Sequence, residues 1–147
     1  MHRAFRRAIL ALSAILALGA VPAAYAADSS AKPAKQRMVM QVSDGDPARW
    51  NLALNNLRNV QKELGRDNVD LEVVAYGPGI SMLKMDSPVG NRIAEAMKGG
   101  IRVVACENTM HGQKLTKADM LPEIGYVRAG VVELIERQKE GYAYIRP

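Results

Sequence analysis

The chain has 147 residues, with 20 lysines and arginines, 15 aspartates and glutamates, two histidines and one cysteine. A single cysteine cannot form an internal disulfide, so the fold cannot depend on such a bridge. The charges alternate in sign and form no basic run, which gives no reason to expect a nucleic-acid partner. With so few histidines, a multi-histidine metal site within one chain is excluded, and we predict no metal and no cofactor.

The first 26 residues have the pattern of a cleaved secretory signal peptide. Three arginines precede an uncharged apolar run at Ala8–Val21, and the small residues at Ala24–Ala26 fit the cleavage pattern. The run is shorter than the roughly 20 residues that a membrane-spanning helix needs, which favours cleavage over an uncleaved anchor. Removing the three arginines leaves 17 basic against 15 acidic residues, a net charge of +2. We therefore expect an exported, periplasmic protein without membrane association after cleavage.

Residues 27–37 are polar and contain a proline, so we expect a flexible leader, and residues 38–147 have the length of one domain. Five apolar or β-branched runs in this domain predict strands. They are Met38–Ser43, Val69–Gly77, Ile101–Cys106, Gly125–Val127 and Tyr142–Arg146. Because helical patterns separate these runs, we predict an α/β fold with a largely parallel five-stranded sheet and helices on both faces.

The longest helix is expected to begin at Asp46, which can cap it, with Pro47 as its first residue, and to end at Gly65. Its buried face follows from helical spacing: Trp50, Leu54, Leu57, Val60 and Leu64. The Gly77–Ile80 stretch predicts a sharp loop. A second helix is predicted over Asn91–Lys98, closed by two glycines.

The last third of the chain continues the alternation of predicted strands and helices. A short helix within residues 108–114 is expected to be capped by Asn108 or Thr109. Thr116 and Asp119 have the spacing of a capping box at the start of another short helix. The final helix is predicted within residues 130–141, with these residues facing inward: Val131, Leu134 and Ile135.

Three loops are the candidate site, because open parallel sheets bind ligands outside the carboxyl ends of their strands. They comprise residues 44–46, 77–79 and 106–109, which follow the first, second and third strands. If these strands are neighbours, the loops line one edge of the sheet. Gly77 and Gly79 match no phosphate-loop pattern and indicate a tight turn or a close backbone approach.

Cys106, at the end of the third strand, has two interpretations. A cysteine in this position can be a small buried apolar residue. Alternatively, the N–H groups at the start of the following helix stabilise a thiolate, which is the reactive form. His111, about one turn further on, would add positive charge or accept the proton, whereas Glu107 would raise the pKa of the thiol.

Other polar and sulfur-containing residues have simpler explanations. Asp44 and Asp46 have the chemistry of metal ligands, but turn formation and capping explain both. The methionines are scattered through predicted elements, as expected for core residues rather than a copper site. The Ser81–Met85 segment, with two methionines and a leucine beside a lysine, predicts either an interface or ordinary core packing.

Three stretches resemble the DsrE/DsrF-like proteins, which include the YchN-like group. They are VVAYGPGISML, SPVGNRIAEAMKGGIRVVACENTM and KLTKADMLP followed by GYVRAGVVELIERQKEGYAYIRP. The resemblance extends from Met38 to Pro147, and within that family the chain resembles an exported branch. It implies a three-layer α/β/α sandwich and homo-oligomers, often trimers or hexamers, and it implies a link to sulfur chemistry.

The best understood of these relatives are cytoplasmic, carry sulfur as a cysteine persulfide and pass it between proteins. Their sulfur-carrying cysteine precedes the helix that here is Asn91–Lys98, where this chain has no cysteine. Other relatives have a C-x-x-C pair at the end of the third strand. In this chain Cys106 fits the first position of that pair, and Thr109 occupies the second.

Two functional hypotheses follow. In the first, Cys106 is the nucleophile or persulfide site of a protein that handles or binds sulfur species, and a sulfur-transfer protein is its partner. His111 would assist, and the donors to a sulfur anion would be Gly77, Gly79, Asn108 and Thr109. In the second, the chain is a non-catalytic homo-oligomeric module that binds a small ligand or a protein, and Cys106 is structural.

Overall fold

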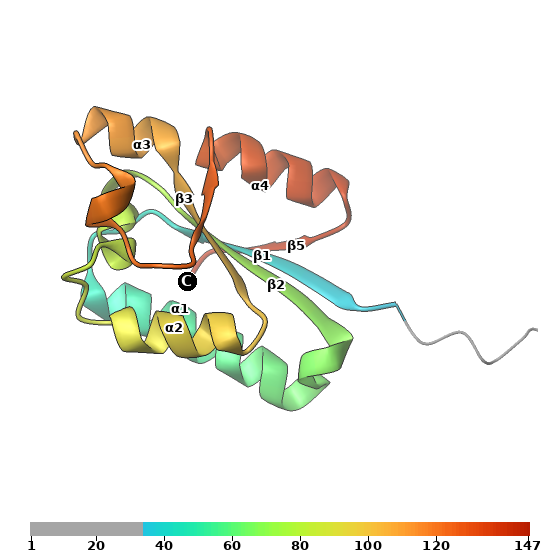
Figure 1. The fold of residues 1–147 in the computed structure, drawn as a ribbon. Coiled ribbons are helices and arrows are strands. Elements are labelled where there is room, and N and C mark those ends of the chain that lie inside the picture. The colour runs from blue at the N-terminus through green and yellow to red at the C-terminus, as the bar shows by residue number, and fades with distance from the viewer. Residues whose placement is uncertain (1–33) are drawn as a thin grey trace, which may run out of the picture. The chain divides into compact units, whose positions relative to one another are not determined.

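Five strands form one sheet with the spatial order β4-β3-β2-β1-β5 in the computed structural model, which describes residues 34–147 (Figure 1). All neighbouring strands are parallel. Their bounds are β1 (Gln36–Val42), β2 (Val69–Ala75), β3 (Arg102–Cys106), β4 (Gly125–Val127) and β5 (Ala143–Ile145). The alternation of strand and helix patterns in the sequence therefore predicted the fold class correctly. The predicted signal peptide and residues 27–33 of the predicted leader lie outside the described residues.

Helices cover both faces of the sheet. On one face lie α1 (Pro47–Leu64) and α2 (Gly90–Lys98), and on the other lie α4 (Gly130–Lys139) and the short α3 (Glu107–Gly112) (Figure 1). Three 3-10 helices connect these elements: Arg66–Asn68, Gly77–Leu83 and Lys117–Asp119. The result is a three-layer α/β/α arrangement.

The first helix begins and ends where its sequence predicts. The Asp46 carboxylate accepts a hydrogen bond from the Ala48 N–H (2.8 Å), Pro47 is the first helical residue, and Gly65 ends the helix with a φ of 85°. Trp50 on this helix is buried, and its indole N–H donates to the Asp44 carbonyl. Leu64 is exposed, contrary to the prediction, and it is the last residue of the helix.

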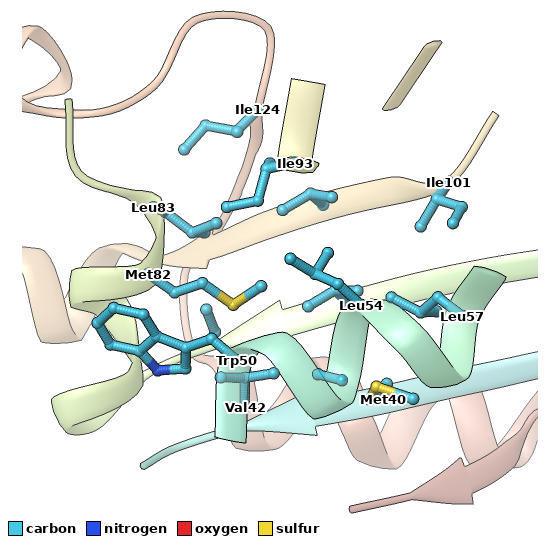
Figure 2. Packing of buried hydrophobic residues seen from close by; sticks show 14 of the residues in the cluster. Met40, Val42, Trp50, Leu54, Leu57, Met82, Leu83, Ile93, Ile101 and Ile124 are labelled. Carbon is cyan, nitrogen blue, oxygen red and sulfur yellow. The ribbon is translucent and has the colours of Figure 1, made fainter. Parts of the chain in front are cut away.

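The main apolar core lies between the sheet and the α1/α2 layer. Figure 2 shows side chains of both helices and of β1 pointing into it, together with Met82 and Leu83 of the Gly77–Leu83 segment. Met82 and Leu83 are fully buried, whereas Met85 is 61% exposed. Core packing, and not an interface, therefore explains the apolar residues of Ser81–Met85, apart from Met85.

Two further predictions were wrong in detail. The Gly77–Ile80 stretch is not an open loop but the first part of a 3-10 helix. In α4 only Leu134 is buried among the three residues predicted to face inward, while Val131 and Ile135 are 52% and 46% exposed. Within residues 34–147, the short α3 is the only other helix on that face of the sheet, so these residues leave the flanks of α4 uncovered.

Candidate functional site

The three loops predicted to carry the site meet at one edge of the sheet, because β1, β2 and β3 are neighbours. The Gly79 N–H donates to the Ser43 carbonyl (3.2 Å), and the Gly77 N–H donates to Thr109 Oγ1 (3.0 Å). A side chain at Gly79 would collide with the Val42 carbonyl, so only glycine fits this close backbone approach. The first two loops are thus joined by a backbone–backbone hydrogen bond, and the last two by a bond from a backbone N–H to a side-chain hydroxyl.

Cys106 lies where β3 passes directly into α3. It is the N-cap residue of that helix, and its exposed fraction is 5%. The prediction that Asn108 or Thr109 caps the helix was wrong, because no loop separates strand and helix and the helical turn already begins at Glu107. Their side chains are therefore inside the first turn and available for other contacts.

The thiol of Cys106 is surrounded by hydrogen-bond donors. Thr109 Oγ1 accepts the Gly77 N–H, which leaves its own hydroxyl proton free to point at the sulfur. The backbone N–H groups of Gly130 and Thr109 also face the sulfur. Burial, the largest single effect, raises the pKa of the Cys106 thiol, but these donors together outweigh it, so the pKa lies below its ordinary value.

Two helices begin beside this sulfur. Gly130 is the first residue of α4, and Thr109 lies in the first turn of α3, so the free N–H groups of both helices converge on it. The segment before α4 is tied to α3, because the Asn108 N–H donates to the Arg128 carbonyl (3.1 Å). The same carbonyl accepts a long, weak contact from the protonated thiol, with Sγ 3.9 Å away. Loss of the thiol proton would therefore remove only one weak interaction.

The structure does not bring every predicted site residue to the sulfur. His111 is exposed near the end of α3, and no hydrogen bond or ion pair of its side chain occurs among the described residues. Gly77 and Gly79 each use their N–H group on a neighbouring loop, so these two residues shape the site rather than donate to a ligand. Cys106, Thr109 and the backbone of Asn108 do lie together.

The surroundings of Cys106 also include residues that the sequence did not predict. The Tyr76 ring packs against Gly130, where an added Cβ would lie 3.0 Å from Tyr76 Cδ1. Burial raises the pKa of the Tyr76 hydroxyl, Tyr144 and Cys106 raise it further, and Arg146 lowers it. Gln113 donates to the Gly77 carbonyl (3.2 Å). No spacing in the sequence places Tyr76 or Gly130 near the cysteine, because their proximity depends on the strand order.

A surface hollow of about 440 Å³ lies where α3 and α4 begin. Its walls include Asn108 and Arg128, whose backbone groups flank the sulfur, and Val132 and Glu133 of α4. Cys106 itself does not line this hollow.

Other kinds of site are not apparent in residues 34–147. No three histidine, cysteine, aspartate or glutamate side chains gather there closely enough to hold a metal ion. No helix within the same residues has the length and apolar character needed to cross a membrane.

One family model matches most of this chain. The model of the DsrE/DsrF-like family matches residues 36–147. The structure is similar to that of MTH1491 from Methanobacterium thermoautotrophicum, a protein of unknown function, with 35% identity and a TM-score of 0.74. That similarity covers 77% of this chain and 100% of that one. No curated protein matches the chain.

Two more distant structures share the fold. BT1422 from Bacteroides thetaiotaomicron, also of unknown function, has 16% identity and a TM-score of 0.63, over 76% of this chain and 95% of that one. The ychN protein from E. coli has 13% identity and a TM-score of 0.62, over 76% of this chain and 99% of its own.

Proposed function

This chain belongs to the DsrE/DsrF-like family, and from that premise we propose that it is an exported protein that handles or binds sulfur species through Cys106. Export rests on the N-terminal signal-peptide pattern. The expected compartment is the periplasm, with no membrane association and no nucleic-acid partner. A separate sulfur-transfer protein is the expected partner in such a role.

One arrangement carries this proposal: Cys106 is buried at the start of α3 and next to the start of α4, and the donors around its sulfur lower the pKa of the thiol. A buried thiol without donors has a raised pKa and is inert. Here Thr109 and the N–H groups of Thr109 and Gly130 supply donors for a sulfur anion.

The chemistry requires no additional oxidant or reductant. With thiosulfate, the Cys106 thiolate attacks the outer sulfur, the sulfur–sulfur bond of thiosulfate breaks, and sulfite leaves with the electron pair of that bond. The product is the cysteine persulfide anion, and atoms and charge balance. Transfer to a partner thiolate repeats the displacement at the outer sulfur of the persulfide.

Mass spectrometry of the folded protein after thiosulfate or polysulfide treatment tests this proposal. We expect a gain of one sulfur atom that is reversed by a reductant and is absent from Cys106→Ser. In parallel, the alkylation rate of Cys106 should rise with pH around a midpoint below that of a free cysteine. A Cys106 that gains no sulfur and resists alkylation in folded protein would falsify the proposal.

A second candidate function is supported by a different observation. Val131, Val132 and Ile135 form an exposed apolar strip on α4, and Tyr144 and Ile145 on β5 are also exposed. Such surface is typical of a homo-oligomeric binding module, a trimer or hexamer, in which Cys106 is structural. Analytical ultracentrifugation distinguishes a monomer from these assemblies. Cys106→Ala separates the two candidates, because only the first predicts that sulfur handling is lost.

A further inference from the structure

A second hollow, of about 210 Å³, lies in the groove between α1 and α2, in the helical layer opposite α4. Three guanidinium groups line it: Arg58, Arg66 and Arg92. Leu54, Ala96 and Ile101 form its apolar wall. Figure 2 shows Leu54 and Ile101 at the side of the core that this groove borders. None of these residues belongs to the Cys106 site.

Arg92 is held in place without being neutralised. Its two terminal nitrogens donate to the carboxamide oxygens of Asn51 and Asn55 on α1, the second at 2.7 Å. A carboxamide is uncharged, so these bonds orient the guanidinium and leave its positive charge uncompensated. Because the side chain is already fixed, an anion that binds it loses little side-chain entropy.

The other two arginines are free to turn toward an anion. Neither Arg58 nor Arg66 makes an ion pair with any acidic residue in the described part of the chain. Glu95 is the one carboxylate among the described residues that line this hollow. Gln61 is fixed by its donation to the Gly99 carbonyl (2.8 Å) and forms part of the wall.

Positive charge continues beyond this hollow. An adjoining hollow shares Gln61 and Arg66 and adds Lys35, Lys98 and Asp67. Together the two are lined by five cationic and two acidic side chains, a net charge of +3. This exceeds the +2 of the whole chain after removal of the predicted signal peptide, so the excess positive charge is concentrated in this groove.

We propose that the α1/α2 groove binds a small organic molecule that carries a tetrahedral oxyanion, a phosphate or a sulfonate, on an apolar body. Guanidinium groups from three different elements match the several acceptor oxygens of such a group, and arginine binds it in bidentate geometry. The apolar wall receives the remainder of the ligand, since pockets of this kind combine apolar surface with a few polar anchors.

Titration of the full chain with anilinonaphthalene sulfonate, an aromatic sulfonate whose fluorescence rises in apolar surroundings, tests this proposal. We expect saturable binding that weakens as sodium chloride is added. Phenyl phosphate and toluenesulfonate should displace the probe, and their relative potency shows whether phosphate or sulfonate is preferred. Inorganic phosphate should compete less well, because it has no apolar part.

The double variant Arg58→Gln/Arg66→Gln should bind the probe about tenfold more weakly or worse, since it loses two charge-assisted contacts. Arg49→Gln, an exposed arginine of the same helix that does not line the groove, is the matched control. Cys106→Ser should bind as the wild type does, which separates this proposal from the one on sulfur species. Absence of saturable binding, insensitivity to salt, or equal losses in the double variant and in Arg49→Gln would overturn it.

Discussion

The two faces of the sheet are built in different ways. Between the sheet and the α1/α2 layer, a continuous core extends from Met38 to Ile124 and includes residues of every strand except β4 and β5. Between the sheet and α4, the buried cluster comprises four residues: Val39, Val74, Leu134 and Tyr142. The first face therefore provides most of the apolar burial that stabilises the fold.

The α4 face instead contains a charge network at its centre. Glu72 of β2 is fully buried, and Arg102 and Arg137 approach its Oε2 to 2.9 and 3.0 Å. Oε1 has no hydrogen-bond donor among the described residues, so part of the cost of burying this carboxylate is not offset. Arg137 lies on α4 and also pairs with Glu133 of the same helix at 2.8 Å, so its contact with Glu72 ties α4 to the sheet.

The difference in packing between the two faces bears on the proposed sulfur chemistry of Cys106. The thinly covered face is the one on which α4 begins beside Cys106 and on which apolar side chains remain exposed. A face with few apolar contacts opens more easily than a close-packed one. Most of the apolar burial and the proposed reactive site thus lie on opposite sides of the same sheet, and substitutions on each side should have distinct effects.

The largest effect is expected in the main core. Leu57→Ala removes a fully buried side chain of α1 and should lower the free energy of unfolding by about 2–5 kcal/mol. Leu52→Ala, at a 43% exposed position of the same helix, is the matched control and should change it by about 0.5 kcal/mol or less. Urea denaturation measures both. Equal effects would show that the α1/α2 face is not the close-packed one.

A pH-dependent effect is expected on the α4 face. Burial raises the pKa of Glu72, and Arg102 and Arg137 only partly oppose this rise. Burial lowers the pKa of Arg137, but Glu72, Glu140 and Glu133 outweigh this effect, so the guanidinium stays charged. Glu72 is therefore the member of this network that gains or loses a proton in the acidic range. The folded state then binds this proton more tightly than the unfolded state does.

The sign of the pH dependence follows from that difference. As the pH rises above about 4.5, the ordinary value for a glutamate, stability should fall until Glu72 has ionised in the folded state. Glu72→Gln, which resembles the protonated side chain, should remove this component. Thermal unfolding across the acidic range measures it as the difference between the two proteins. Parallel profiles would mean that Glu72 is ionised throughout.

A smaller effect is expected at the thiol. Thr109→Val keeps the side-chain volume but removes the hydroxyl that donates to Cys106, so the pKa of the thiol should rise and alkylation near neutral pH should slow by about tenfold. Thr109→Ser, which keeps the hydroxyl, should retain most of the rate. If both variants react alike, the backbone N–H groups alone set the pKa.

Local signals predicted much of the fold correctly. Asp46, Pro47 and Gly65 mark the ends of α1, and Thr116 and Asp119 form the expected capping box. These features depend on residues within a few positions of one another, which is why the sequence reveals them. The placement of Cys106 at the carboxyl edge also follows from the alternation of strands and helices.

What the sequence could not reveal depends on contacts between distant segments. The donors from Gly130 and the contact of Tyr76 require β4 to lie next to β3, an order that no periodicity encodes. Likewise, helical spacing gives α4 an apolar stripe, but it does not show that Val131 and Ile135 are left about half exposed by the described part of the chain. The hydrogen bonds that Arg92 of α2 donates to Asn51 and Asn55 of α1 join two helices, so no short-range pattern in the sequence predicts them.

The smallest effect on the stability of the single chain is expected at the exposed strip of α4. Val131→Ser/Ile135→Ser changes two side chains that are about half exposed, so protomer stability measured at low concentration should change by about 0.5 kcal/mol per site or less. If the strip is an interface, the same double variant should shift a trimer or hexamer toward smaller species in sedimentation velocity. Glu136→Ser, an exposed polar position of α4, controls for the substitution itself. A wild-type protein that sediments as a monomer would leave the strip as ordinary surface and would show that the sparse α4 face is complete within one chain.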